Sequence, residues 1–332
     1  MKRSAICVVL AACVLAAFVL AGCGNKGQEP PPPPPNAAPA AKAPAKVFTI
    51  GMSQCNRGEP WRVQMDADIK AAAEKHPELK VIFNDAQNKT ETQQSQVREF
   101  IAQGVDLIII SPKESVPLTK PVAEAMEKGI PVIVLDRAIE GDKFTCFIGG
   151  DNVKIGEEAG KAMVKLLGGK GNVVELKGLT TSVPSKDRHD GFMTGIKGSE
   201  IKVIFTADCK WLEPEAQKEM KSALSRFDKI DGVYGANDPS AHGAYLAAKQ
   251  EGKGRESSIK FVGVDALPHE GVAYVKDGIL AATLQYPTGG EQAIDTALKI
   301  LNKTGETIPK KIVLGTRLFT KENVEAGGEE IK

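Results

Sequence analysis

Short hydrophobic runs alternate with amphipathic segments along the first half of this chain. The runs are rich in β-branched residues, and near-continuous apolar runs of this kind are typical of parallel strands that are covered on both faces. They occupy residues 47–52, 80–83, 107–110 and 132–135. Between them apolar residues recur every three or four positions, as at Met65, Ile69 and Ala72, which predicts helices that bury one face. Thr90 and Gln93 have the spacing of a capping box for the second helix.

The same alternation restarts after Asp151. Further strands are predicted at 172–176, 201–205, 232–234, 261–264 and 281–284. The helices between them are predicted at about 153–167, 185–197, 214–227 and 239–251. Two successive strand–helix series of similar length predict an α/β fold with two doubly wound parallel-sheet lobes.

The amino terminus has the pattern of an export signal. Lys2 and Arg3 precede an apolar run that is too short to span a bilayer and that ends in Leu-Ala-Gly-Cys at 20–23. This ending resembles a bacterial lipobox, which implies that residues 1–22 are removed and that Cys23 carries the lipid. The alternative is an ordinary signal peptide with a chance cysteine. Either interpretation predicts a protein that works outside the cytoplasm, and the first anchors it to a membrane.

Residues 23–45 read as a tether. They contain six consecutive prolines, Pro30 to Pro35, and no bulky apolar side chain that a core would bury. Such a composition favours a semi-rigid polyproline II spacer. A proline-rich ligand for a recognition domain is the alternative.

Composition narrows the function classes. The part of the 332-residue chain that follows the tether is too long for one core and suits two lobes. Lys and Arg number 43 against 42 Asp and Glu, so there is no electrostatic case for nucleic acid. Outside the signal and Cys23 the cysteines are Cys55, Cys146 and Cys209, which allow at most one disulfide and show no metal-binding spacing. We expect three buried free thiols, no metal and no cofactor.

Polar residues follow the predicted strands, where open parallel sheets bind their ligands. The candidate ligand-binding residues are Trp61, Arg62, Asp136, Arg137, Arg188, Trp211, Asn237, Asp265 and Gln285. Carboxylates, guanidinium groups and amides together suit the hydroxyls of a polyol, and an indole can cover the apolar face of a sugar ring.

The charges of this set favour a neutral ligand. The three arginines are matched by three aspartates, Asp136, Asp238 and Asp265, whereas an anionic ligand usually requires surplus positive charge. For Asp238 and Asp151 a role as helix N-caps is the alternative.

These residues occur along the chain in an order that resembles the periplasmic sugar-binding proteins of ribose-binding type, which deliver sugars to ABC transporters. The resemblance runs from Val47 to about Leu318 and is carried by short motifs. They are Gly-Met-Ser-Gln at 51–54, Gln-Gly-Val-Asp-Leu-Ile-Ile-Ile-Ser-Pro at 103–112, Ile-Pro-Val-Ile-Val-Leu-Asp-Arg at 130–137, Asp-Asn at 151–152, Lys-Asp-Arg at 186–188, Gly-Phe at 191–192, Ala-Asn-Asp at 236–238 and Gly-Val-Asp at 263–265.

The resemblance implies a type 1 periplasmic binding protein fold in which a three-stranded hinge joins the lobes. Its crossings are expected near 150–151, 285–286 and 312–313. The N-terminal lobe would then comprise 46–150 plus 286–312, and the C-terminal lobe 151–285 plus 313–332.

The resemblance also implies which residues contact the sugar, namely Asp136, Arg137, Arg188, Asn237, Asp265 and Gln285, with an aromatic ring near Trp211. The first loop departs from the ribose-binding pattern of paired phenylalanines. Its Pro60-Trp61-Arg62 is similar to the branch that binds galactofuranose. We therefore expect a monosaccharide, a pentose or hexose in pyranose or furanose form, and doubt ribose itself.

The expected function is a monomeric, lipid-anchored binding protein that hands a neutral monosaccharide to an ABC permease and ATPase. A sugar-sensing subunit for a membrane kinase or chemoreceptor would use the same cleft and stays open as an alternative. An enzyme is the weaker alternative, since the four histidines are scattered and no nucleophile motif is present. Acid–base work by Asp136 and Asp265 on a glycosidic bond would be its chemistry.

Overall fold

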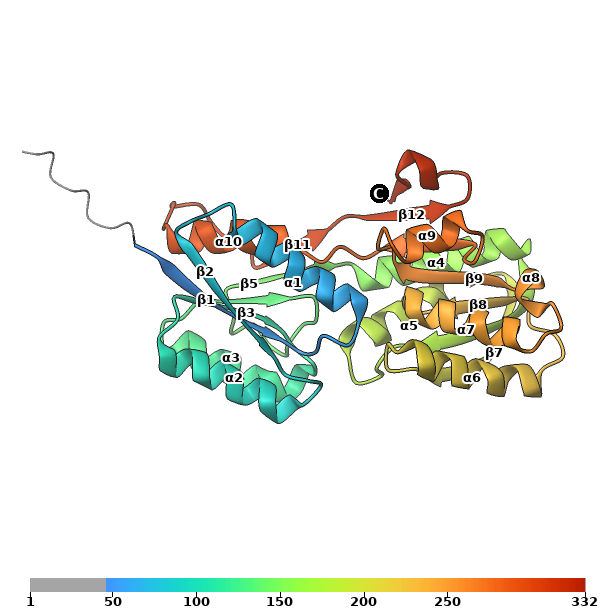
Figure 1. The fold of residues 1–332 in the computed structure, drawn as a ribbon, viewed down its shortest axis with the longest axis horizontal. Coiled ribbons are helices and arrows are strands. Elements are labelled where there is room, and N and C mark those ends of the chain that lie inside the picture. The colour runs from blue at the N-terminus through green and yellow to red at the C-terminus, as the bar shows by residue number, and fades with distance from the viewer. Residues whose placement is uncertain (1–45, 332) are drawn as a thin grey trace, which may run out of the picture. The chain divides into compact units, whose positions relative to one another are not determined.

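The computed structural model describes residues 46–331. The signal peptide expected at 1–22, the lipid attachment expected at Cys23 and the tether expected at 23–45 lie outside the described residues. Two mainly parallel sheets, each covered by helices on both faces, make up the described part (Figure 1). Among the helices of residues 46–331, none is both long enough and apolar enough to cross a bilayer.

The first sheet belongs to the N-terminal lobe and is parallel throughout, with the strand order β11-β5-β4-β3-β1-β2. Its strands are β1 (Phe48–Gln54), β2 (Leu79–Asp85), β3 (Leu107–Ser111), β4 (Val132–Leu135), β5 (Cys146–Gly150) and β11 (Lys311–Leu314). Helices α1 (Pro60–Ala73) and α10 (Gly290–Leu301) pack together, as do α2 (Thr90–Gln103) and α3 (Ser115–Glu127). Alternate residues of β3 enter opposite cores: Ile109 joins the core that contains α1 and α10, and Ile110 joins the core that contains α2 and α3.

The second sheet has the order β13-β12-β10-β9-β8-β6-β7, in which only β12 runs antiparallel to its neighbours. Its strands are β6 (Lys170–Lys177), β7 (Glu200–Asp208), β8 (Gly232–Gly235), β9 (Lys260–Asp265), β10 (Ala282–Gln285), β12 (Thr316–Thr320) and β13 (Glu329–Ile331). Its helices are α4 (Asn152–Leu167), α5 (Val183–Gly195), α6 (Glu213–Arg226), α7 (Asp238–Gln250), the short α8 (Arg255–Ser258) and α9 (Gly271–Lys276), with a 3₁₀ turn at Val324–Ala326. The pairs α4 with α5 and α6 with α7 cover the sheet.

This architecture confirms the predicted fold class. In each sheet the strand order reverses once near one edge, between β1 and β3 in the first and between β6 and β8 in the second. The carboxyl ends of the strands beside such a reversal are where doubly wound folds bind ligands. A ligand site is therefore expected at the loops that follow β1, β3 and β4 in the first sheet and β6, β8 and β9 in the second.

The chain passes between the two sheets three times. The first crossing lies between Gly150 of β5 and Asn152 of α4, and the Asp151 carboxylate caps α4 by accepting a hydrogen bond from the Lys154 amide at 3.0 Å. The second runs from β10 to α10, between residues 285 and 290. The third lies at Gly315, beyond the expected 312–313, because β11 continues to pair with β5 as far as Leu314.

The predicted capping box of α2 is wrong. The N-cap residue is Lys89, and it makes no side-chain cap. The Gln93 side chain instead donates to the Ser111 carbonyl at 2.9 Å and accepts from the Lys113 amide at 2.8 Å. The Thr90 hydroxyl donates to Glu114 at 2.6 Å. The Gln93 amide thus connects α2 to the end of β3 and satisfies one backbone carbonyl and one backbone N–H there.

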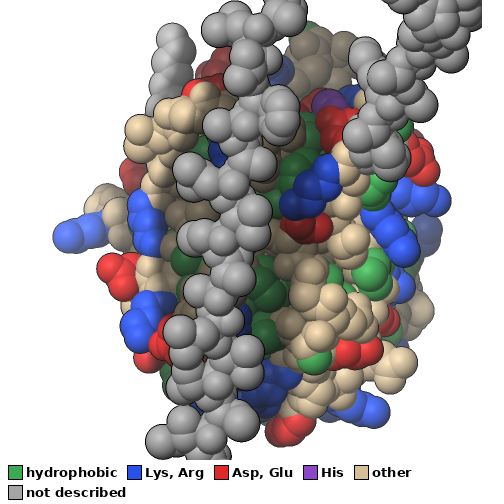
Figure 2. Space-filling view, turned by 90° about the vertical axis from the view of Figure 1, so that its left-hand side faces the viewer, with side chains coloured by type: hydrophobic (Ala, Val, Ile, Leu, Met, Phe, Trp, Pro, Cys, Tyr) green, Lys and Arg blue, Asp and Glu red, His purple; other side chains and the backbone are tan. Residues whose placement is uncertain are grey.

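The surface agrees with the balanced composition. Where grey atoms do not cover the face seen in Figure 2, basic and acidic side chains are interspersed. Cys55, Cys146 and Cys209 are buried free thiols, as predicted.

Candidate functional site

A small, polar cavity lies where the carboxyl ends of the two sheets meet. Its side chains leave a free volume of only about 20 Å³, roughly the room that one water molecule needs, so the two walls lie close together in this structure. Eight of the nine predicted ligand-binding residues line it. The full lining is Glu59, Trp61, Arg62, Asp136, Arg137, Pro184, Arg188, Trp211, Asn237, Asp265 and Tyr286.

The wall from the N-terminal lobe is organised around Arg62, which lies in the first turn of α1. Its Nη2 donates to Asp136 Oδ2 at 2.7 Å, its Nη1 donates to Ser111 Oγ at 2.7 Å, and its Nε lies 3.5 Å from Glu59 Oε2. Burial alone would raise the pKa of Asp136. The guanidinium groups of Arg62 and Arg137 and the hydrogen bond from Tyr286 outweigh it, so the pKa is lowered and Asp136 stays ionised.

Trp211 brings the C-terminal lobe against this wall. Its ring lies 5.8 Å from the Arg137 guanidinium and 5.4 Å from that of Arg188, so two cations from opposite lobes flank one indole. A Cβ atom at Gly178 would lie 2.3 Å from the ring, which explains why a glycine follows β6 at this point. The Asn237 amide donates to the Trp211 carbonyl at 3.1 Å and fixes the loop that carries the indole.

The wall from the C-terminal lobe leaves one carboxylate without donors. Arg188 on α5 donates from Nε to Asn152 Oδ1 at 2.9 Å and from Nη1 to the Ala236 carbonyl at 2.6 Å. Its Nη1 lies 3.7 Å from Asp265 Oδ1, which is too long for a hydrogen bond. Among the described residues no group donates to the Asp265 carboxylate. Burial raises the pKa of Asp265 well above its usual range, against the opposing effect of Arg188 and with a further contribution from Asp238.

Asp238 does not line the cavity. Its carboxylate accepts hydrogen bonds from the Ala266 amide at 2.7 Å and from the Thr283 hydroxyl at 2.6 Å, and burial raises its pKa to about 8. It is not the N-cap of α7 either, because Asn237 takes that role and accepts from the Ser240 amide at 3.1 Å. Glu59 replaces Asp238 in the charge count, so three carboxylates still face three guanidinium groups.

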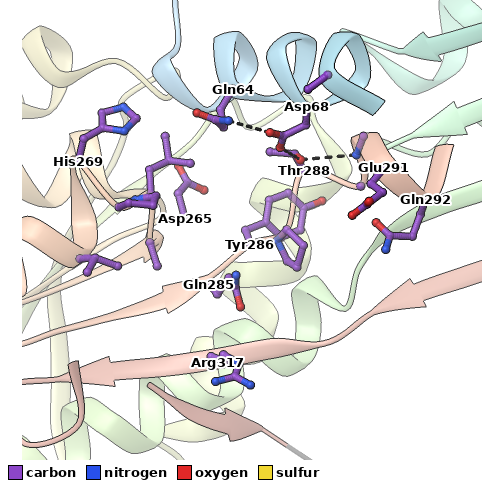
Figure 3. A pocket seen from close by; sticks show the side chains of 18 of the residues that line it. Gln64, Asp68, Asp265, His269, Gln285, Tyr286, Thr288, Glu291, Gln292 and Arg317 are labelled. Atoms are coloured by element: carbon purple, nitrogen blue, oxygen red, sulfur yellow. Dashed lines mark hydrogen bonds between the residues drawn. The ribbon is translucent and has the colours of Figure 1, made fainter. Parts of the chain in front are cut away.

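Gln285 does not line this cavity, although it pairs with Asp265 across β9 and β10. It lines a wider groove of about 840 Å³, which Asp265 also borders and which Figure 3 shows beside the second crossing. There Asp68 of α1 accepts hydrogen bonds from Gln64 and from Thr288. Side chains alternate along β10, so Gln285 shares the sheet face of Thr283 and does not enter the interlobe cavity.

Sequence reasoning missed Tyr286 and Glu59. Tyr286 follows Gln285 directly and was treated only as part of a crossing, although its hydroxyl donates to Asp136 Oδ1 at 2.7 Å. Glu59 stands in the loop after β1, beside the selected Trp61 and Arg62. Tyr286 lies one position and Glu59 two positions from a strand-end candidate, and that proximity was the available signal.

Three lining residues have strained backbones. The φ angles are +70° at Asp136, +70° at Trp211 and +124° at Asp265, a region that non-glycine residues rarely adopt. Such strain costs of order 1–3 kcal/mol per residue and concentrates at ligand-binding sites. Here it turns two carboxylates and an indole toward one small space.

The groups that line the cavity suit a neutral, hydroxylated molecule, for which the two walls would have to move apart. Its three carboxylates accept from hydroxyls, its three guanidinium groups donate to hydroxyl oxygens, and its two indoles offer apolar faces. An anion would upset the balance of three charges against three, and an apolar molecule would leave these buried charges without hydrogen bonds.

Comparisons with known proteins identify the family of this chain. The profile of the periplasmic binding protein domain matches residues 50–307. The ribose import binding protein of Bacillus subtilis is 31% identical over 96% of this chain and 100% of its own length. The galactofuranose-binding protein of Escherichia coli is 33% identical over 84% of this chain and 89% of its own. A solved structure, the fructose-binding periplasmic domain of a hybrid two-component system, is 42% identical with a TM-score of 0.80 and covers 84% of this chain and 93% of its own. The chain therefore belongs to the periplasmic binding protein domain family, within its sugar-binding branch.

Proposed function

We propose that this protein captures a neutral monosaccharide in the interlobe cavity and delivers it to an ABC sugar importer, without chemical change to the sugar. The observation that carries the proposal is the cavity itself, which is lined by groups from both lobes and in which carboxylates and guanidinium groups are equal in number. The Asp265 carboxylate is 6% exposed and receives no donor from the described residues, so a sugar hydroxyl would satisfy it. Asp265 would be the principal acceptor, and Arg137, Arg188, Trp61 and Trp211 would surround the ring.

The proposal extends to the anchor and to the assembly. We propose a lipoprotein that is attached through Cys23, held from the membrane by residues 23–45 and exposed outside the cytoplasm. It would act as a monomer whose lobes close on the sugar and whose closed form the permease recognises.

Titration calorimetry on the purified protein tests the binding step. The panel would contain ribose, fructose, galactofuranose, arabinose and glucose, together with glucuronate as an anionic counterpart of glucose. We expect one neutral sugar to bind at micromolar or tighter affinity and to be recovered unchanged, and glucuronate to bind more weakly than glucose. Failure of every neutral sugar to bind, or a preference for the uronate, would contradict the proposal.

The Arg188→Ala variant tests the site. It removes the donors to Asn152 and Ala236 and the guanidinium that lies 3.7 Å from Asp265, so we expect a loss of at least ~2 kcal/mol in binding free energy. Arg57→Ala is the matched control, because Arg57 belongs to the loop before α1 but is 41% exposed and pairs with Asp66. Equal affinities for Arg188→Ala and Arg57→Ala would reject the assignment of the cavity as the sugar site.

A sensing role is the second candidate, and the likeness to the periplasmic domain of a hybrid two-component system favours it. Sugar uptake separates the two. Loss of this protein would abolish uptake of the bound sugar if it serves an importer, and would leave uptake intact but remove a transcriptional response if it serves a kinase.

A further inference from the structure

Tyr286 connects both lobes through its main chain. It follows β10 at the start of the second crossing and is 3% exposed. Its amide donates to the Asp265 carbonyl of the C-terminal lobe at 3.2 Å. Its carbonyl accepts from Trp61 Nε1 of the N-terminal lobe at 2.7 Å. The backbone of one residue is thus bonded to a lining residue of each wall.

The Tyr286 side chain continues this connection. Its hydroxyl donates to Asp136 Oδ1 at 2.7 Å and accepts from Asn152 Nδ2 at 3.4 Å. Asn152 Oδ1 in turn accepts from Arg188 Nε at 2.9 Å, and the Arg188 guanidinium lies 4.4 Å from the centre of the Tyr286 ring. A continuous series of hydrogen bonds therefore runs from the carboxylate of one lobe to the guanidinium of the other.

The first crossing is shaped to admit this ring. A Cβ atom at Gly150 would lie 2.6 Å from Tyr286 Cε2, so a larger residue there would displace the aromatic side chain. The Tyr286 ring also stacks on Trp61 with centroids 5.0 Å apart. Two of the three crossings and both walls of the cavity therefore meet at one tyrosine.

We infer that Tyr286 and Asn152 are positioning residues that hold Asp136 and Arg188 in their binding arrangement before a ligand arrives. A lobe motion that separates Asp136 from Arg188 would break a bond in the series, because its two ends belong to different lobes. A bond that such a motion breaks favours the arrangement with the lobes together, and ligand affinity rises with the population of that arrangement. The consequence for sugar affinity rests on the proposed function, whereas the effect on the lobes does not.

The two tryptophans of the chain allow a test without ligand. Both are replaced by 5-fluorotryptophan in the full-length protein, and ¹⁹F NMR is recorded without sugar. Trp211 is the reporter, since its ring faces Arg137 of the opposite lobe. We expect Tyr286→Phe and Asn152→Ala each to shift or broaden the Trp211 resonance and to increase the radius of gyration in small-angle scattering. Tyr245→Phe is the control, because Tyr245 packs on Phe261 within the C-terminal lobe.

Unchanged Trp211 resonances and radii in both variants would overturn the inference. Where a sugar binds, Tyr286→Phe should weaken it roughly tenfold, mainly through faster dissociation, because the lost hydrogen bond involves a charged partner. A loss of affinity with no change in the ligand-free protein would also overturn it, since Tyr286 would then act as a direct ligand contact. If no sugar binds the wild-type protein, the proposed function fails, and the ligand-free measurements still decide the role of Tyr286.

Discussion

The buried ion pair between Arg62 and Asp136 provides a quantitative test of how this site is held together. The Arg62→Met variant keeps an unbranched apolar side chain and removes the guanidinium group with its charge. Both partners have side chains that are 3% exposed, and the atoms Nη2 and Oδ2 are 2.7 Å apart. Breaking a buried pair by removing one partner typically costs about 3–5 kcal/mol, because the other charge is left without compensation.

The pH dependence identifies the cause of the loss. In the wild-type protein the lowered pKa of Asp136 means that the ion pair stabilises the fold above the ordinary aspartate pKa and is lost in acid. Without Arg62, burial raises this pKa and Arg137, whose Nε is 3.8 Å from Oδ2, compensates only in part. Protonation at lower pH then relieves the buried charge. We expect a loss of about 3–5 kcal/mol at pH 8 and a loss at least ~1 kcal/mol smaller at pH 5.

Urea unfolding followed by circular dichroism measures the free energy of unfolding of both proteins at the two pH values. Arg57→Met is the matched control, because the Arg57–Asp66 pair is also short, 2.8 Å, but Arg57 is 41% exposed. An exposed pair of this kind contributes about 0–1 kcal/mol. Equal losses for the two arginine variants, or a loss at Arg62 that is the same at pH 5 and pH 8, would refute the reasoning.

Three further predictions follow from other parts of the chain. The wild-type protein should lose stability as pH rises from about 4 to 8, with a contribution of up to ~1.4 kcal/mol per pH unit from Asp238, because burial raises the pKa of Asp238 to about 8 when folded. Melting temperatures across this range should be flatter for Asp238→Asn. Gly178→Ala should weaken sugar binding in calorimetry, since the new Cβ displaces Trp211, whereas Gly58→Ala, with its nearest neighbour at 3.6 Å, should bind normally. Cys23→Ser should move the protein from the membrane fraction to the soluble fraction in cell fractionation, and retention in the membrane would argue against the lipid anchor.

The fold could be predicted because buried parallel strands leave a strong local signal. Each residue of β3 is fully covered, so the hydrophobic run at 107–110 is continuous and unmistakable. The edge strand β11 alternates exposed and half-buried positions over only four residues, and β5 ends in two glycines. Such segments become strands through pairing with neighbours, which the local pattern does not record. The third crossing lies at Gly315, a few residues beyond the expected 312–313, for the same reason.

The clustering of most candidate residues could be predicted because strand ends meet at one edge of a sheet. This rule brought together Asp136, Arg188 and Asp265 from segments that lie far apart in the chain. Gln285 pairs with Asp265 at the end of β10, but of the two only Asp265, with its φ of +124°, also borders the interlobe cavity. Tyr286 was beyond its reach, because its partners Asp136 and Trp61 are 150 and 225 residues away.

Each lobe contains an arginine and an aspartate in equivalent positions, but the two pairs differ in their separation. In each lobe an arginine on the helix after the first strand faces an aspartate at the end of the fourth strand: Arg62 with Asp136, and Arg188 with Asp265. The first pair is closed at 2.7 Å and the second is open at 3.7 Å. Asn152, which begins the helix after the first crossing, causes the difference, because it and a backbone carbonyl hold the guanidinium of the second pair. One lobe thus has a carboxylate already neutralised by protein groups, and the other has a carboxylate that still needs donors. The incoming hydroxyl should therefore bind mainly to the C-terminal lobe, with the N-terminal wall closing over it.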